Sequence, residues 1–273
     1  MNASLLALGA AVAYGLADFT GGFATKRRSA WAVAGWSQVV GVLALVIGVV
    51  VVPATEVRPQ DLIAGGIAGV FGVFGLGLLY RSLADGQMAL LTPVVAASGG
   101  ALTVIAGVFG GDRLDALDMA AIAATFVAVL LVASPGEGDV PDRRPLFLAV
   151  AAGVCFGLFY VAMAQTSEAS GLWPLVPARV ASIGIALVLA GPDRWPPVRD
   201  RFGWVVATGL LDMVANLFIV LAAQRGPLAI VGVLSSLHPV VTIAVAIVWL
   251  RERPRPVQVV GMATAIGAAL LLA

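Results

Sequence analysis

The chain has 273 residues, of which 60% are hydrophobic and 11% are charged, and its formal net charge is +1. Soluble domains carry about 25% charged residues, so the composition excludes an ordinary soluble protein. The near-zero net charge offers no basic field for nucleic acid. One cysteine and one histidine exclude an internal disulfide and the usual zinc sites. No phosphate-binding or hydrolase motif occurs, so we expect no metal, no cofactor and no enzymatic activity.

Long apolar segments follow one another along the chain. About 20 apolar helical residues cross a hydrocarbon slab of about 30 Å. Seven segments lack any charge over 18 or more residues, and three others carry one charge each, namely Asp18, Arg179 and Asp212. In chain order the ten segments are 3–24, 29–55, 62–80, 86–111, 119–136, 145–167, 172–191, 202–223, 226–250 and 256–273.

The segments are apolar all round and too long for the strands of a membrane barrel. They predict an all-α integral membrane protein with ten transmembrane helices. Residues 3–24 exceed the length of a signal-peptide core, so we interpret them as a retained first span.

The two halves of the chain resemble each other. Residues 61–133 align without a gap on 201–273 at an offset of 140, which pairs Gly69 with Gly209. Upstream the offset is 142. We therefore predict two five-helix repeats, 1–134 and 145–273. Because five is odd, the second repeat enters the membrane inverted, a plan typical of secondary transporters that bind substrate near the midplane.

Basic residues are distributed unevenly between the two ends of the predicted bundle. The odd-numbered connections carry 12 lysines and arginines, whereas the even-numbered ones carry only Arg58, Arg113 and Arg225. Short basic connections remain cytoplasmic. This pattern predicts that both termini face away from the cytoplasm.

Three segments resemble the EamA-type family of the drug/metabolite transporter superfamily. They are Tyr14-Gly-Leu-Ala-Asp-Phe-Thr-Gly-Gly22, Ser235-Ser-Leu-His-Pro-Val-Val-Thr242 and Leu250-Arg-Glu-Arg-Pro-Arg-Pro-Val-Gln-Val-Val-Gly261. The resemblance implies ten helices, an inverted repeat and a central cavity lined by the first four helices of each half. It also implies that the fifth and tenth helices pack together and that the protein transports small metabolites. Two features depart from the family pattern: Tyr14 replaces a common tryptophan, and the segment Gly110-Gly-Asp-Arg-Leu-Asp115 is degenerate.

Asp18 is the charged residue of the first span. It lies four residues after Tyr14, on the same helical face. A carboxylate at bilayer depth usually faces a cavity or a partner, so Asp18 is a candidate proton-binding group. The alternative is a structural pair with Lys26, Arg27 or Arg28.

Polar residues of three other spans form a second group. Asp212 and Asn216 stack at i and i+4 in the eighth span, and Arg179 in the seventh requires a nearby anion. We predict that they line the cavity with Gln38, and that Arg179 meets a carboxylate of the protein or of the substrate. The alternative is a fixed Arg179–Asp212 pair that only holds two spans together.

His238 and Pro239 lie in the middle of the ninth span. The proline removes a backbone hydrogen bond and weakens the helix near Ser235, and histidine titrates in the physiological range. The matching first-half span carries Pro93 and Gly99, so we predict paired helix breaks at the binding site. The alternative for His238 is a hydrogen-bonded packing role.

Other small or charged residues predict scaffold contacts. Gly65 and Gly69, and likewise Gly107 and Gly111, have the spacing that allows two helices to approach closely. We interpret Glu252, in the last connection, as a structural residue that caps the tenth helix or pairs with Arg253, and the alternative is a gating role.

These features predict a multi-pass secondary transporter of the inner or plasma membrane, as a monomer or homodimer. It would move a small, amino-acid-like or related metabolite by alternating access. Protons are a candidate coupling ion, through Asp18, Asp212 or His238, and a counter-substrate or downhill flux are the alternatives. The resemblance favours export. The alternative is a membrane-embedded enzyme or a lipid-handling protein.

Overall fold

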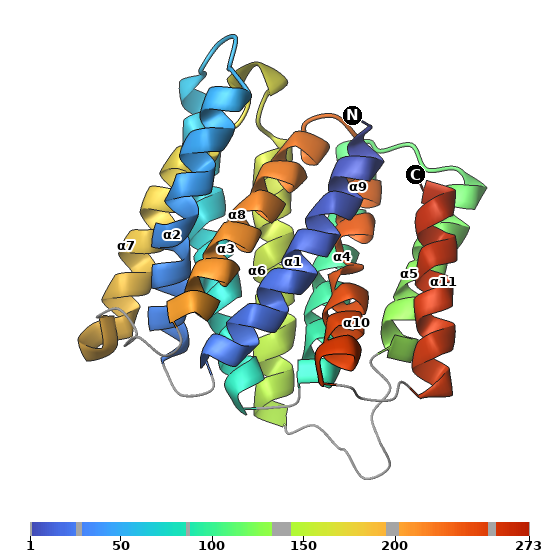
Figure 1. Cartoon of the computed structure of the whole chain (residues 1–273). Coiled ribbons are helices and arrows are strands. Elements are labelled where there is room, and N and C mark those ends of the chain that lie inside the picture. Colours follow the sequence, from blue (N-terminus) through green and yellow to red (C-terminus); the bar gives the residue numbers. More distant parts are fainter. Residues whose placement is uncertain are drawn as a thin grey trace.

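The protein is a helical bundle, seen here in a computed structural model (Figure 1). The structure describes residues 2–25, 29–85, 88–132, 143–194, 202–250 and 255–272. These residues form eleven α-helices and the short 3-10 helices η1 (Glu168–Ser170) and η2 (Gly191–Arg194). The α-helices are α1 Ala3–Thr25, α2 Ala30–Val51, α3 Pro59–Asp85, α4 Met88–Gly110, α5 Ala116–Val132, α6 Arg143–Ala164, α7 Leu175–Ala190, α8 Phe202–Ala223, α9 Leu228–Ser235, α10 His238–Leu250 and α11 Pro256–Leu272.

Most of the helices are long and apolar enough to cross a membrane. By length and composition seven spans qualify within the described residues, and one of them, Leu228–Trp249, combines α9 with most of α10. The helices α5, α7 and α11 are apolar but shorter, with 16 or 17 residues. The prediction of an all-α membrane protein is confirmed.

Helices from the two halves of the chain pack against each other. The pair α1 and α8 is in contact, as is the pair α6 and α3, while α2 contacts both α7 and α8. The helices α5 and α11 form a separate pair at one side of the bundle (Figure 1), as the resemblance implied for the fifth and tenth spans. The start of α1 and the end of α11 lie at the same end of the molecule, marked by the labels N and C in Figure 1.

Two glycines permit close crossings between the halves. A Cβ atom on Gly69 would collide with the backbone of Ala178 in α7, and one on Gly209 would collide with Ser37 O in α2. Gly65 approaches Pro174 in the same way, so the predicted role of Gly65 and Gly69 is confirmed. These contacts hold α3 against α7 and α8 against α2 at backbone distance.

The second glycine pair behaves differently. Gly107 contacts Ala229 at the start of α9, but Gly111 lies beyond the end of α4 and has open space around its Cα. Its φ of +100° belongs to the left-handed region that glycine adopts where helices end. The prediction that Gly111 is a helix-contact residue is therefore wrong.

The expected pair of helix breaks occurs in only one half. The predicted ninth span divides at Ser236 and Leu237, between α9 and α10. By contrast, α4 continues past both Pro93 and Gly99, so the predicted break there is wrong. Pro93 lies in the second turn, where it removes a single bond to the first turn. Gly99 instead permits a close approach of α6, because its Cβ would lie 3.0 Å from Gly153 O.

A buried polar network holds the connections together at the end where the termini lie. Asp61 is 1% exposed, and its Oδ2 accepts hydrogen bonds from Ser170 Oγ (2.7 Å) and the Ser167 amide (3.1 Å). Gln224 Nε2 donates to Thr166 Oγ1 and to Gly171 O, each at 3.0 Å. The connection between α6 and α7 is thereby fixed to the start of α3 and the end of α8.

Some predictions concern residues outside the described ranges. Glu252 and Arg253 belong to this group, as do Lys26, Arg27 and Arg28. Asp112, which the repeat alignment pairs with Glu252, is described: its Oδ2 accepts a 2.8 Å hydrogen bond from the Ala229 amide at the start of α9.

Candidate functional site

Three adjoining pockets lie between the two halves of the bundle. The largest has a volume of about 430 Å³ and shares Tyr14, Leu76, Phe156 and Asp212 with the second. The second pocket shares Phe156, Tyr160 and His238 with the third. Among the described residues, α5 and α11 contribute nothing to these linings, whereas every other α-helix does. This agrees with the cavity that the resemblance implied.

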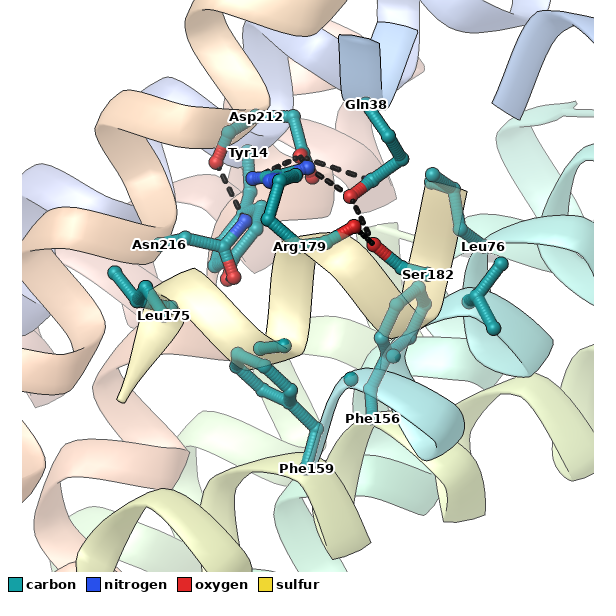
Figure 2. A pocket seen from close by; sticks show the side chains of 14 residues that line it. Tyr14, Gln38, Leu76, Phe156, Phe159, Leu175, Arg179, Ser182, Asp212 and Asn216 are labelled. Atoms are coloured by element: carbon teal, nitrogen blue, oxygen red, sulfur yellow. Dashed lines mark hydrogen bonds and ion pairs between the residues drawn. The ribbon is translucent and has the colours of Figure 1, made fainter. Parts of the chain in front are cut away.

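The largest pocket combines one polar wall with an apolar one. Figure 2 shows its lining. The residues are Tyr14, Gln38, Gly69, Gly72, Val73, Leu76, Phe156, Phe159, Leu175, Ala178, Arg179, Ser182, Asp212 and Asn216.

Arg179 is at the centre of the polar wall. Its Nη1 lies 3.4 Å from Asp212 Oδ2, and the same nitrogen donates to Gln38 Oε1. Gln38 in turn donates from Nε2 to Asp212 Oδ2 at 3.3 Å. The three side chains, from α7, α8 and α2, therefore form a closed triangle of contacts, and they point toward one another in Figure 2.

Three further groups extend this triangle along the cavity. Ser182 Oγ donates to Gln38 Oε1 at 2.9 Å. Asn216 Nδ2 donates at 2.7 Å to the backbone carbonyl of Asp212, which lies one turn earlier in α8. Tyr14 donates from its hydroxyl to Asn216 Oδ1 at 3.3 Å. The predicted residues Tyr14, Gln38, Arg179, Asp212 and Asn216 thus belong to one cluster.

The cluster buries two opposite charges. The side chains of Arg179 and Asp212 are only 5% and 10% exposed. A buried ion requires a partner, because removing either one leaves an uncompensated charge. The pair links α7 to α8 and also lines the cavity, so its geometry fits both the cavity-lining role and the structural role.

A second ionisable pair lies in the adjoining pocket. Asp18 Oδ2 and His238 Nδ1 are 2.7 Å apart, with side chains 8% and 12% exposed, and neither atom makes a hydrogen bond within the described ranges. The described neighbour of Asp18 is therefore a histidine of α10. In the part of the chain that the structure describes, no group of three His, Cys, Asp or Glu residues could hold a metal ion.

The break between α9 and α10 positions His238 beside Asp18. Ser236 Oγ donates to Val233 O at 2.7 Å and Ser235 Oγ to Gly232 O at 2.9 Å, which satisfies carbonyls near the end of α9. His238 then begins α10, with Pro239 in its first turn, where the missing N–H has no helical acceptor. Both serines line the third pocket, together with Gly99 of α4.

Sequence reasoning missed several lining residues, four of which carry polar or aromatic groups. Ser182, Tyr80, Phe156 and Tyr160 all face the pockets. A signal for two of them was present in the repeat: the upstream offset of 142 pairs Tyr14 with Phe156 and Asp18 with Tyr160. The positions that this alignment pairs in α1 and α6 thus all line the pockets.

Comparison with known proteins identifies related folds and a family. A solved structure described as "Crystal structure of protein" superimposes with a TM-score of 0.76 at 19% identity, over 99% of this chain and 97% of its own, which shows a shared fold. No curated protein matches the chain. The model of the EamA-like transporter family matches residues 1–134 and 143–273, nearly the whole length. The chain therefore belongs to the EamA-like transporter family, a membrane transporter family of the drug/metabolite transporter superfamily.

Proposed function

We propose that the protein is a secondary transporter that exports a small, amino-acid-like zwitterion across the inner or plasma membrane. Substrate would bind at the Arg179–Asp212 cluster, and protons would drive the transport. The observation that carries the proposal is a buried ion pair that lines a cavity between the halves.

A zwitterion matches the charges of the cluster. Its carboxylate would take the place of Asp212 at the guanidinium of Arg179, and its ammonium group would pair with the released carboxylate. Neither buried charge then loses a partner, which would otherwise cost about 3–5 kcal/mol. A substrate of single charge would leave one ion of the pair uncompensated.

The apolar wall suits the remaining body of such a substrate. Phe156 and Phe159 of α6 and Leu76 of α3 face the same pocket as Arg179 (Figure 2). A pocket with a largely apolar lining and a few polar groups orients a ligand by its head. We infer an aliphatic or aromatic side chain on the substrate, because this wall offers only apolar contacts.

The inferred mechanism is alternating access by two inverted five-helix repeats, 1–134 and 145–273, which together give ten spans when α9 and α10 count as one. Contacts exchanged between halves support it: α1 packs on α8 as α6 packs on α3, and α2 packs on α8 as α7 packs on α3. Gly69 and Gly209, 140 residues apart, occupy equivalent crossings. A site at the interface of such repeats becomes accessible from each side in turn when one repeat moves against the other.

The test has two steps. Metabolites released by cells with and without the protein are compared, and the compounds enriched in the medium are then assayed for flux in sealed proteoliposomes. We expect compounds that carry both a carboxylate and an amine. Arg179→Ala should abolish their flux although the protein inserts, whereas Arg225→Ala, an arginine paired with Glu168 at the bundle end, should preserve it.

Two outcomes would contradict the proposal. Release of compounds without a carboxylate would refute the role of Arg179 as an anion site. Absence of any substrate-dependent flux in liposomes would refute secondary transport and favour the membrane-embedded enzyme or lipid-handling alternative.

A further inference from the structure

The Asp18–His238 pair is not explained by the substrate cluster. It joins α1 of the first half to α10 of the second, at a distance of 2.7 Å. Despite this short distance, the carboxylate oxygen and the imidazole nitrogen make no hydrogen bond in the described part of the chain. A buried carboxylate beside an imidazole can bind or release a proton.

We propose that Asp18 and His238 together form a single-proton site that couples proton movement to transport. The proposal rests on the transporter function and adds the identity of the coupling site. One proton is taken up by the pair, converting an anionic carboxylate beside a neutral imidazole into a pair of zero net charge. The proton is held by Asp18 or by His238, and it leaves again from the same group, so charge and mass balance without another reactant.

The surroundings of the pair favour one proton. The titratable or charged side chains that share its pocket are Tyr14 of α1, Tyr80 of α3, Tyr160 of α6 and Asp212 of α8. No lysine or arginine lines that pocket within the described ranges, and the charge of Asp212 is balanced by Arg179. The unprotonated pair therefore leaves the cavity with one uncompensated negative charge, and proton uptake removes it.

The pair lies where two helices from different halves of the chain cross. A Cβ on Gly15 would lie 2.6 Å from His238 O, and Thr242 Oγ1 donates to Gly15 O at 3.0 Å, so α1 and α10 cross at backbone distance beside the pair. The turn at Ser236 and Leu237 separates α10 from α9. Proton release weakens the attraction between α1 and α10, because an ion pair becomes an ion beside a neutral ring.

Two residues link the pair to the substrate cluster. Asp212 lines both pockets, and Tyr14 lines both as well while it donates to Asn216. A substrate that displaces Asp212 from Arg179 separates this carboxylate from its positive partner. The electrostatic potential at Asp18 therefore changes. Substrate occupancy and proton occupancy therefore influence each other's affinity, which is the requirement for coupling.

The first arm of the test needs no substrate. Infrared difference spectra of the purified protein are recorded against pH, and the carboxylic-acid band of Asp18 is identified by its loss in Asp18→Asn. We expect its pH midpoint to move by about one unit or more in His238→Gln, since strongly interacting groups titrate as a pair. Asp18→Glu, which displaces the band, replaces Asp18→Asn if that variant does not accumulate. An unchanged midpoint overturns the proposal.

The second arm measures coupling in proteoliposomes that contain a trapped pH dye. The probe is a mixture of labelled L-amino acids, applied with and without a pH gradient. Asp18→Asn and His238→Gln should lose gradient-driven accumulation at least tenfold more than they lose downhill exchange. Asp118→Asn, which changes a carboxylate in the first turn of α5, a helix that lines none of the three pockets, should retain both.

The two proposals fail in different ways. Accumulation that ignores the pH gradient in the wild type, or that survives both substitutions, refutes the proton site and leaves the transporter standing. Absence of amino-acid flux in every variant refutes the substrate class, while the infrared midpoint still decides whether the pair binds its proton as one unit.

Discussion

Arg179 of α7 and Asp212 of α8 lie 3.4 Å apart and are almost fully buried, and Gln38 of α2 contacts both of them. This triangle makes one wall of the central cavity and joins a first-half helix to two second-half helices. Its members therefore influence both transport and folding, and substitutions must separate these effects.

The ion pair itself is tested by single and double substitutions. Arg179→Leu and Asp212→Leu should each reduce accumulation of folded protein, since an uncompensated buried charge costs about 3–5 kcal/mol. The double variant Arg179→Leu/Asp212→Leu should recover most of that loss and still fail to transport. Accumulation in membranes and flux in liposomes are measured together. An active double variant would show that the pair only holds α7 to α8.

Gln38 orients the guanidinium for its ligand. Gln38→Leu should raise the KM for transport by roughly 10- to 100-fold, because a hydrogen bond to a charged group contributes about 1.5–3 kcal/mol. Ser182→Ala removes only a donor to Gln38 and should have a smaller effect. KM values from initial rates check the order of the two variants. Equal KM values for the two variants would contradict the role of Gln38 in orienting the guanidinium of Arg179.

Asp61 stabilises the end of the bundle where the termini lie. Asp61→Ala removes the acceptor of Ser170 Oγ and of the Ser167 amide, so we expect a loss of about 2–4 kcal/mol in stability. Thermal unfolding in detergent measures the effect. Glu56→Ala, an exposed carboxylate that contacts only Arg58 among the described residues, is the matched control and should change the melting temperature little.

The glycine crossings predict a contrast between two similar substitutions. Gly209→Ala places a methyl group against Ser37 O, so α8 and α2 must separate and the protein should unfold at a lower temperature. Gly184→Ala meets no atom within 4 Å and should be tolerated. If both variants melt together with the wild type, the close crossing of α2 and α8 does not exist in the membrane.

Orientation is tested by fusions at the C-terminus. The 12-to-3 distribution of basic residues predicts that both termini face away from the cytoplasm. A phosphatase fused after Ala273 should be active, and a fluorescent protein fused there should be dark because it does not mature outside the cytoplasm. A bright fluorescent fusion would reverse the assigned orientation without affecting the position of the cavity.

The sequence by itself determined the class of the protein and the residues worth testing. Apolar segments of about membrane thickness can only be helices, because every backbone group in hydrocarbon needs an internal partner. Against that background each intramembrane charge is costly and therefore conspicuous, which is why Asp18, Arg179 and Asp212 were identified before any contact was known. The offset between the halves likewise depends only on residue order.

Only the tertiary structure decided which of these residues meet. Arg179 and Gln38 are 141 residues apart in the chain, and the neighbour of Asp18 is a histidine of the other half. The breaks differ for the same reason: α4 remains continuous at Gly99 because α6 packs there, whereas the ninth span divides before His238. Spacing along one helix specifies a face, but the helix that covers this face is set by the packing of all the others, which local periodicity does not encode.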